Sequence, residues 1–526
     1  MDGRFPSYVR TVMEILLDGG HQAYVVGGAV RDLLLGIEPG DFDVTTDARP
    51  ERVKALLEQA GVRVVDNLGQ NLGVVVAVVD HTPVEIATFR GERYGADPHR
   101  PEEVWFCDSL KEDMSRRDFT VNAMALDADG KLYDYFGGRE DLERKLLRTV
   151  GKAERRYAED ALRMYRACRF VAQLGFTYVE EGDDGASAGR VHLLPEKEGE
   201  TGFPAGKDGF GERDTPYYLP TRYTFDVSNC RELSVERVRK ELDKMFTSAH
   251  AGKGLMLFVA SGLAESQCRI RENGEDTYVD VLPELKHLTD LHQNKRFHCY
   301  DAWEHTLLAL DNGSRKLAVR WALLLHDVGK GMPGIRQLNK QGLPSDHGHE
   351  AVSAIMAEKI LTRLRYPADF VKRVCWLISR HMRFAPMLIT GRDLVERWVR
   401  TEAMDGFFRN TREMTEAYEQ LVEVFLGDMG ATWAGVLKEP VMADGVELGK
   451  EVINLAARMP VHTSDLEIGG REVKELLDES GIWNVGDALK YLLTRVQSGN
   501  LANSHDLLRQ GLERRLQKLA RGMRNK

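Results

Sequence analysis

The stretch that decides the fold spans residues 25–43 and reads VVGGAVRDLLLGIEPGDFD. An apolar strand pattern ends at Val26, and helical spacing of apolar residues follows Gly28. Gly27 and Gly28 lack side chains, so the backbone can approach a ligand where the first N–H groups of a helix point outward. The junction predicts a phosphate-binding site, and the alternative is an ordinary tight turn. Arg31 lies one turn into the helix and adds a cation there, unless it is a solvated surface residue.

Two carboxylates close this stretch, Asp41 and Asp43. The short β-rich segment that holds them places residues i and i+2 on one face, so both carboxylates project to the same side. They repel each other unless a cation lies between them. The cation most often found at such a pair of carboxylates is Mg²⁺, because it binds oxygen ligands together with substrate phosphates. Glu85, on a β-rich run from 83 to 88, is a third candidate ligand or an ordinary surface glutamate.

Composition narrows the class of protein. The chain has 526 residues with a hydrophobic fraction of 43%, enough for about three or four domains that each bury a core. Its 72 basic and 82 acidic residues give a net charge of −10, which excludes a uniformly cationic nucleic-acid binder. The sequence has neither a cationic leader nor a long apolar run, so we expect a cytoplasmic protein without a membrane partner. Six cysteines without a C-x-x-C pair indicate reduced, mostly buried thiols.

The patterns change along the chain. Residues 1–150 alternate helical and strand periods, which predicts a small mixed α/β unit. One helix is expected from 157 to 174, and a glycine-rich insertion follows at 180–222. From Ser234 onward helical periodicity dominates, with helices expected at 235–246, 317–325 and 414–425, among others. The predicted class is α+β, with a mixed sheet and its helices first and a mainly helical region after it.

One helical segment, EDALRMYRACRF at 159–170, carries charged residues at successive i+3 steps. These are Asp160, Arg163, Arg166 and Arg169. A solvated face with ion pairs is the ordinary explanation. Cytosine and adenine, however, both present a donor amine beside an acceptor ring nitrogen, and guanine and uracil present the reverse. A carboxylate, which only accepts, and a guanidinium, which only donates, would therefore select C or A, at about 1 to 3 kcal/mol per unpaired buried group.

The order of the motifs resembles a known family. GGAVRD followed by DFD is similar to the head of the DNA polymerase β-type nucleotidyltransferase superfamily. RRDFTVNA at 116–123, DYFGG at 134–138, EDALR at 159–163 and ERVRKE at 236–241 then occur in the order found in class II CCA-adding enzymes, the tRNA nucleotidyltransferases. The resemblance covers roughly residues 20–178 and 231–500.

The resemblance implies a domain order. A polymerase β-like nucleotidyltransferase head would occupy 1–150, and a neck with the nucleotide-reading helix 151–260, interrupted by the insertion at 180–222. An HD-type helical domain would follow at 261–400. A helical body and tail at 401–526 would contact tRNA.

The resemblance also implies an activity, the template-independent addition of the 3′-terminal CCA to tRNA from CTP and ATP. The RNA 3′-hydroxyl would attack the α-phosphate in line and expel pyrophosphate, with two Mg²⁺ ions at Asp41 and Asp43. Asp160 and Arg163 would read the base, and Arg117 and Asp118 would contact the ribose. The implied catalytic and nucleotide-binding residues together are Asp41, Asp43, Glu85, Gly27, Gly28, Arg31, Arg117, Asp118, Asp160, Arg163, Arg166 and Arg169.

A second motif lies in the helical region. Its residues follow the order typical of an HD-type metal phosphohydrolase domain: His305, His326, Asp327, His349 and His381. Such ligands suit a divalent transition metal, whereas a single histidine on an apolar helix is usually a core residue. The family's distal aspartate is missing from the stretch REMTEAYEQL, and Asp405 is only a loose substitute. The resemblance implies cleavage of 2′,3′-cyclic phosphates or removal of phosphates at damaged RNA ends.

Three hypotheses stay open. The first is a CCA-adding enzyme with a possible HD phosphohydrolase side activity, and the stretch 90–104, which resembles the flexible loop of enzymes that add the complete CCA, favours it. The second is a poly(A) polymerase or a CC-adding enzyme. The third is an HD phosphohydrolase with a regulatory nucleotide-binding head. The basic end of the chain, 506–526, would contact tRNA phosphates or is a solvated helix end.

Overall fold

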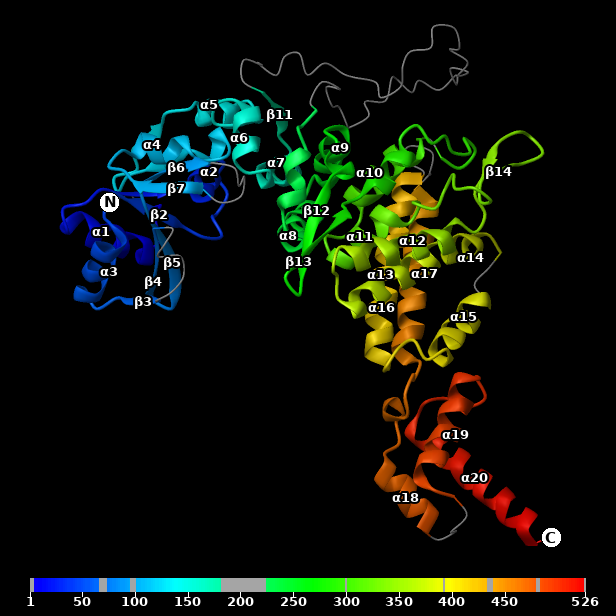
Figure 1. Cartoon of the computed structure of the whole chain (residues 1–526). Coiled ribbons are helices and arrows are strands. Elements are labelled where there is room, and N and C mark those ends of the chain that lie inside the picture. The colour runs from blue at the N-terminus through cyan, green and yellow to red at the C-terminus, as the bar shows by residue number, and fades with distance from the viewer. Residues whose placement is uncertain are drawn as a thin grey trace. The chain divides into compact units, whose positions relative to one another are not determined.

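A computed structural model describes residues 4–65, 73–94, 101–180, 224–298, 300–390, 393–432, 439–478 and 483–524 (Figure 1). The chain divides into two compact units, residues 1–286 and 287–526. The glycine-rich insertion beyond residue 180, the tip of the 90–104 loop and Cys299 lie outside the described residues.

The first unit is built on a seven-stranded sheet of order β3-β4-β5-β2-β1-β8-β9. The strands are β1 Ala23–Val26, β2 Asp43–Thr46, β3 Arg63–Val65, β4 Val74–Val79, β5 Thr82–Thr88, β8 Met124–Leu126 and β9 Leu132–Asp134. Only β2 and β5 pair in parallel among these neighbours, so the sheet is mixed, as predicted. Helices α1 (Ser7–Asp18) and α3 (Pro50–Gln59) pack together beside the strands, and α1 buries one apolar stripe: Val9, Val12, Met13 and Leu16.

Shorter elements complete the head. Helix α2 (Gly28–Leu34) follows β1, and α4 (Leu110–Ser115) lies beside a hairpin of β6 (Arg90–Tyr94) and β7 (Pro101–Phe106). A 3₁₀ turn, η2 (Thr120–Asn122), packs against α5 (Gly138–Glu143). Strand β10 (Leu146–Arg148) then pairs in parallel with β11 (Thr177–Val179), which follows the first long helix of the neck.

The neck is helical, but its first helix is not continuous. The expectation of one helix from 157 to 174 is wrong, because α6 (Ala153–Glu159) and α7 (Leu162–Leu174) are separated at Asp160. Asp160 is extended, with φ −150° and ψ 106°, and its Oδ1 accepts a hydrogen bond from the Leu162 N–H at 3.0 Å. An aspartate can satisfy the first donors of a new helix in this way, so it separates two helices whose apolar periodicity runs on.

Two further helices pack against α7, namely α8 (Val235–Phe246) and α9 (Ala251–Ala260). A Cβ atom at Gly254 of α9 would lie 2.5 Å from the backbone oxygen of Cys168, so α7 and α9 approach each other closely only because this residue is glycine.

One hairpin breaks the mainly helical pattern after Ser234. Strands β12 (Gln267–Glu272) and β13 (Glu275–Asp280) pair antiparallel through Asn273 and Gly274, whose φ angles are 52° and 89°. Two positive φ values are what a two-residue type I′ turn requires. The dipeptide Asn-Gly between alternating residues was a readable hairpin signal that periodicity analysis passed over.

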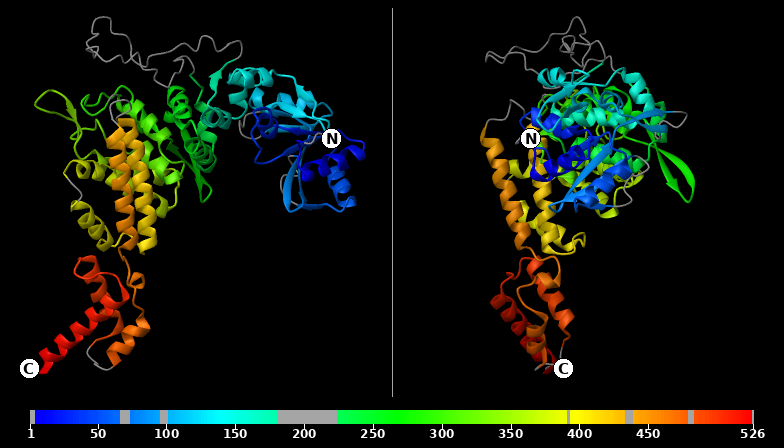
Figure 2. Two further views of the ribbon diagram at one scale, coloured as in Figure 1. Left: turned by 180° about the vertical axis from the view of Figure 1, so that it is seen from behind. Right: turned by 90° about the vertical axis from the view of Figure 1, so that its left-hand side faces the viewer.

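The second unit is a helical domain. Its helices are α10 (Ala302–Asn312), α11 (Leu317–Leu325), α12 (His349–Arg363), α13 (Ala368–Arg380), α14 (Phe384–Thr390), α15 (Asp393–Met404), α16 (Thr411–Thr432) and α17 (Glu439–Arg458). Helices α16 and α17 run side by side in every view (Figures 1 and 2), and α16 also packs on α10 and α11. Trp321, Trp376 and Tyr418 are among its largest fully buried side chains.

The end of the chain forms a small helical group with its own core. Helices α18 (Gly470–Asp478), α19 (Val485–Gln497) and α20 (His505–Arg524) bury leucines and valines between them. Gln497 of α19 joins this group to the preceding segments, because its buried amide donates to the backbone oxygens of Ala403 and Pro460.

Two expectations from composition can be compared with the described part of the chain. The cysteines there are unpaired, and four are buried: Cys107, Cys168, Cys230 and Cys268. The mostly buried thiols are therefore confirmed. Among the described helices, none has the length and apolar character needed to span a bilayer.

Candidate functional site

The predicted carboxylates meet at one place in the central sheet. Asp43 begins β2, between β1 and β5, and the strand register sets it beside Val26 on one side and Glu85 on the other. Residues paired in register on neighbouring strands project to the same face, so the carboxylates of Asp43 and Glu85 are side by side. Asp41, Asp43 and Glu85 are all exposed, which leaves the group open to a ligand.

The electrostatics of this group favour a bound cation. Desolvation, together with the negative charges of Asp41 and Glu85, raises the pKa of Asp43 to about 6, against the opposing effect of Arg117. The carboxylates therefore disfavour one another's charge. An open set of oxygen donors fits Mg²⁺, which completes its coordination with water and substrate phosphates.

The glycine turn lies next to these carboxylates. Gly27 has φ 74° and ψ −131°, a conformation that residues with a side chain rarely adopt, and a Cβ atom there would lie 3.1 Å from Arg117 Nη1. Helix α2 begins at Gly28, as predicted from the apolar spacing. Arg31 is half-buried, and its Nη1 donates to Asn122 Oδ1 at 2.8 Å, so it is not a solvated surface residue.

The arginines of α7 are used in internal contacts. Arg163 donates to Glu159 and to the backbone oxygen of Arg116, while Arg169 donates to Glu241 of α8 at 2.6 Å. Arg163 and Arg169 are buried, so the solvated-face explanation is wrong for this stretch. Arg31 and Arg169 also lie over the ring of Phe170, at 5.5 Å and 4.0 Å from its centroid.

Asp118 is held ionised by α7. Burial alone would raise the pKa of Asp118, but the Arg166 guanidinium outweighs that effect and keeps the pKa below its usual value. The Arg166 Nε donates to Asp118 Oδ2 at 2.7 Å. The helix that carries the predicted base-reading residues is thereby fixed to the motif predicted to contact the ribose.

Asp160 has a neighbour that sequence analysis did not single out. Its Oδ2 lies 3.7 Å from the Nη2 atom of Arg237 in α8. Arg237 belongs to the ERVRKE motif, which was recognised only as part of the family pattern. Asp160 and Arg237 are far apart in the sequence, and the packing of α8 on α7 brings them together.

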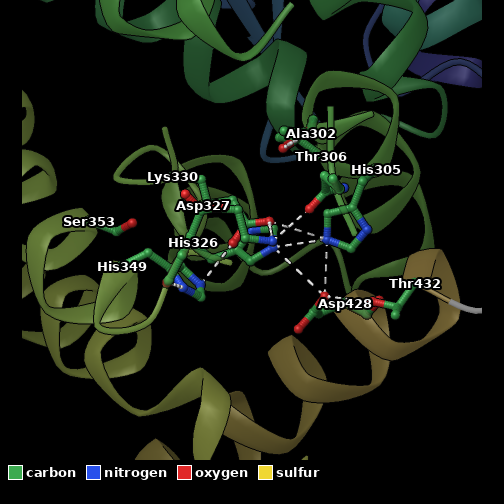
Figure 3. Close-up of polar contacts among 12 residues, drawn as sticks. Ala302, His305, Thr306, His326, Asp327, Lys330, His349, Ser353, Asp428 and Thr432 are labelled. Carbon is green, nitrogen blue, oxygen red and sulfur yellow. Dashed lines mark hydrogen bonds and ion pairs between the residues drawn. The ribbon is translucent and has the colours of Figure 1, made fainter. Parts of the chain in front are cut away.

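The predicted HD residues converge in the second unit (Figure 3). They form two groups, and within each group the possible ligand atoms lie within 4.8 Å of one another. The first group is His305 of α10, His326 at the end of α11 and Asp428 of α16. The second group is Asp327, His349 at the start of α12 and His381 after α13. Five of the six residues are buried, and Asp428 is half-buried.

Asp428 corrects the prediction that the distal aspartate is missing. Its Oδ1 lies 3.1 Å from the Nε2 of His305, and Thr432 donates to the same carboxylate oxygen at 3.2 Å. Asp405, the loose substitute, is instead 3.8 Å from Arg380 Nη2. The expected helix, 414–425, stops three residues before Asp428 and seven residues before the end of α16 at Thr432, because Gly427 weakens the helical signal.

Gly427 itself explains how Asp428 reaches the histidines. A Cβ atom there would lie 3.1 Å from the backbone oxygen of Ala309, so a glycine allows α16 to approach α10 closely. Asp428 is the next residue and is therefore carried to His305.

The charges of this centre favour metal binding. Burial would raise the pKa of Asp327, but His326 and the Lys330 ammonium hold it well below its usual value. Burial and the neighbouring His326 and His349 lower the pKa of His381 to about 3. Ionised carboxylates and a neutral imidazole are the ligand forms that a metal needs.

Comparison with known families finds matches to three segments of the chain. Residues 23–148 match the poly A polymerase head domain, 227–266 the probable RNA and SrmB-binding site of polymerase A, and 298–424 the HD domain. The CCA-adding enzyme of Bacillus subtilis is 50% identical over 173 residues, which are 33% of this chain and 42% of that protein. The CCA-adding enzyme of Lactobacillus johnsonii is 37% identical over 274 residues, 52% of this chain and 58% of that one. This chain resembles the CCA-adding enzymes.

A solved structure extends the likeness to the whole fold. The CCA-adding enzyme of Bacillus stearothermophilus in complex with CTP aligns over 99% of this chain and 100% of its own, with a TM-score of 0.59 and 24% identity. The curated CCA-adding enzymes are matched over about half of their own length.

Proposed function

We propose that the head adds the 3′-terminal CCA to tRNA from CTP and ATP without a template. The observation that carries the proposal is the register of β2 and β5, which sets Asp43 beside Glu85 next to the turn at Gly27. The resemblance to CCA-adding enzymes supports the same activity. With tRNA as the substrate, the reaction would take place in the cytoplasm.

The chain's own residues would bind and orient the reactants. Asp41, Asp43 and Glu85 would hold Mg²⁺, which neutralises the triphosphate and acidifies the RNA 3′-hydroxyl when it is bound. The backbone at Gly27 and Gly28 would approach the phosphates without a side chain in the way. The in-line attack needs the hydroxyl and the α-phosphate held close together, and that positioning is most of the catalysis in such transfers.

Base selection would come from the neck. The Asp160 carboxylate accepts from the amine of cytosine or adenine, and a guanidinium donates to the adjacent ring nitrogen. The family pattern assigns that guanidinium to Arg163. Arg237 of α8, whose Nη2 lies 3.7 Å from Asp160 Oδ2, would orient that carboxylate.

The complete CCA is favoured over CC alone or a poly(A) tail. The stretch 90–104, which resembles the loop of full CCA-adding enzymes, contains strand β6 and most of strand β7, and these two strands pair with each other. Strand β6 begins at Arg90, with one residue between it and the end of β5, the strand that carries Glu85.

The assay uses tRNA lacking its terminal CCA, incubated with the purified chain, Mg²⁺, CTP and ATP. Three added nucleotides in the order C, C, A support the proposal. Two added C residues would indicate a CC-adding enzyme, a long A tail a poly(A) polymerase, and no addition a regulatory head.

The tail would contribute nonspecific RNA contacts. Arg509 pairs with Glu513, and Arg515 lies over the rings of Trp483 and Tyr491, so both serve within the tail. Three other basic side chains of α20 are exposed and spaced along one helix face: Arg514, Lys518 and Arg521. They would contact tRNA phosphates, in a manner that weakens with salt and ignores sequence.

We also propose that the second unit is a metal-dependent phosphohydrolase for phosphate esters at RNA ends, including 2′,3′-cyclic phosphates. The specific observation in its favour is the buried convergence of four histidines with Asp327 and Asp428. The test is release of phosphate from a 3′-phosphate and opening of a 2′,3′-cyclic nucleotide in the presence of Ni²⁺ or Mn²⁺. Asp327→Asn should abolish both reactions and leave CCA addition intact.

A further inference from the structure

Asp113 is a fully buried carboxylate of helix α4 and is not among the catalytic or binding residues expected from the sequence. It lies three residues before Arg116 and four before Arg117, a spacing at which side chains meet along a helix. Its side chain has no exposed surface. Because a buried carboxylate without cationic partners is strongly destabilising, the partners of Asp113 indicate its role.

The two carboxylate oxygens of Asp113 have different partners. Oδ1 accepts hydrogen bonds from Arg116 Nε at 3.0 Å and Nη2 at 2.8 Å, and from the Arg90 backbone N–H at 3.3 Å. Oδ2 accepts no hydrogen bond from the described residues, and Arg117 Nη2 lies 3.6 Å from it. Three N–H groups therefore fix the carboxylate and leave one oxygen directed at Arg117.

The Arg117 guanidinium lies at the glycine turn. A Cβ atom at Gly27 would lie 3.1 Å from Arg117 Nη1, and the buried Arg117 Nε has no hydrogen-bond partner within the described chain. Burial lowers the pKa of Arg117, and Asp113 is the strongest of the charges that oppose this effect, ahead of Asp43. Asp113 is thus the main counter-charge of a guanidinium that still has a donor without a partner.

The two other charged residues of the motif RRDFTVNA are fixed by protein contacts. Arg116 donates to the α4 carboxylate and also to Glu92 Oε1 at 3.2 Å. Asp118 accepts a hydrogen bond from Arg166 Nε at 2.7 Å. Arg117 is the arginine of the motif that remains for the nucleotide, and the resemblance implies that it contacts the ribose.

We propose that Asp113 is a positioning residue for Arg117. Its Oδ2 neutralises the Arg117 guanidinium and holds it at the Gly27 turn, where the guanidinium donates to a ribose hydroxyl of the bound nucleotide. The inference rests on the function proposed above, because it requires a nucleotide at this turn. Asp113 is buried and does not touch the nucleotide, so its effect on binding passes through Arg117.

The experiment compares two nucleotides that differ in the sugar. Isothermal titration calorimetry of the full chain with Mg²⁺ measures the Kd of CTP and of 2′-deoxy-CTP, and the ratio of the two gives the preference for ribose. Asp113→Asn keeps an acceptor for Arg116 but removes the charge that faces Arg117. We expect the preference to fall about 10-fold, the loss of one charge-assisted hydrogen bond. A general disturbance of the fold would weaken the binding of both nucleotides alike and leave the ratio unchanged.

Three further variants make the test specific. Arg117→Gln should lower the preference for ribose as far as Asp113→Asn does. The double variant should lower it no further, because Asp113 acts through Arg117. Asp108→Asn changes an exposed carboxylate just before α4 and should keep the preference of the unchanged chain.

Two results would overturn the proposal: an unchanged ratio in a folded Asp113→Asn chain, or a ratio in the double variant well below that of Arg117→Gln. If Asp113→Asn does not fold, as judged by circular dichroism, crystals of the unsubstituted chain with CTP decide. The proposal predicts Arg117 within about 4 Å of Asp113 and within about 3.2 Å of a ribose hydroxyl. An Arg117 side chain turned away from either group would overturn it.

The role of Asp113 and CCA addition are refuted by different results. A chain that binds CTP but adds nothing to tRNA would refute CCA addition, while the ratio of the two Kd values still tests Asp113. CCA addition together with an unchanged ratio in Asp113→Asn would refute the role of Asp113 alone. A chain that binds no CTP would refute both.

Discussion

Arg166 of α7 holds Asp118 of the head, with Nε 2.7 Å from Oδ2. Asp118 also accepts a hydrogen bond from the Phe119 N–H at 2.8 Å, so its carboxylate is fixed from two sides. The pair joins the helix proposed to read the base to the motif proposed to contact the ribose. The spacing between base and sugar contacts is then set by the protein, which is what selection without a template requires.

Removing Arg166 should weaken the link between helix α7 and the segment that holds Asp118. Arg166→Gln leaves the buried Asp118 carboxylate without its cation, and we expect a loss of about 1 to 3 kcal/mol in the free energy of unfolding, because the arginine is partly exposed. Thermal or urea denaturation measures it. The double variant Arg166→Gln, Asp118→Asn should recover part of the loss. No recovery would show that the pair is not the source of the effect.

Removing one head carboxylate should stop nucleotide transfer. Asp41→Asn is expected to lower the rate of CTP incorporation by at least about 10²-fold, because a metal ion contributes several kcal/mol to charge stabilisation. Glu51→Gln, an exposed carboxylate at the start of α3, is the matched control and should keep full activity. Transfer at an unchanged rate by a folded Asp41→Asn chain would discard the metal assignment.

Removing the carboxylate of Asp160, which we propose reads the base, should weaken selectivity more than rate. For Asp160→Ala we expect the kcat/KM preference for CTP over UTP to fall about 10- to 100-fold, the cost of one unpaired buried group. Competition between labelled CTP and UTP measures the ratio. Arg237→Gln should give a smaller decrease, because Arg237 acts through Asp160. If selectivity is the same in both variants and in the unchanged chain, base reading lies elsewhere.

The pKa of Asp43 predicts a pH dependence of the metal-free chain. Its folded pKa of about 6 lies above the unfolded value, so the folded chain binds the extra proton between about pH 4 and pH 6 and loses stability as pH rises through that window. Asp43→Asn should therefore raise the free energy of unfolding at pH 7, by about 1 kcal/mol after allowance for solvent screening, and change it little at pH 4. Urea denaturation in EDTA at the two pH values checks the sign. The prediction is contradicted if, between pH 4 and pH 7, the free energy of unfolding of the unchanged chain rises relative to that of Asp43→Asn.

The helices that sequence analysis located best are those with a regular apolar period. The expected helices at 235–246 and 317–325 coincide with α8 and α11. Ser234 caps α8 with its side chain, and α11 is apolar on most faces, so local signals suffice at both places. The mixed sheet and the α+β class also follow from local patterns.

The contacts that complete the two sites were not local. Asp43 of β2 pairs with Glu85 of β5, and this pairing depends on a parallel register that the sequence does not specify. Arg237 reaches Asp160 only through the packing of α8 on α7. Asp428 was missed because Gly427 weakens the helix propensity, although close packing on α10 requires that glycine.

The most direct measurement of the central claim is the position of CTP bound to the crystalline protein with Mg²⁺. The account predicts the triphosphate at the turn of Gly27 and Gly28, Mg²⁺ on Asp41 and Asp43, and the cytosine amine within hydrogen-bond distance of Asp160. A nucleotide bound away from these carboxylates, or a cytosine that does not contact Asp160, would contradict it.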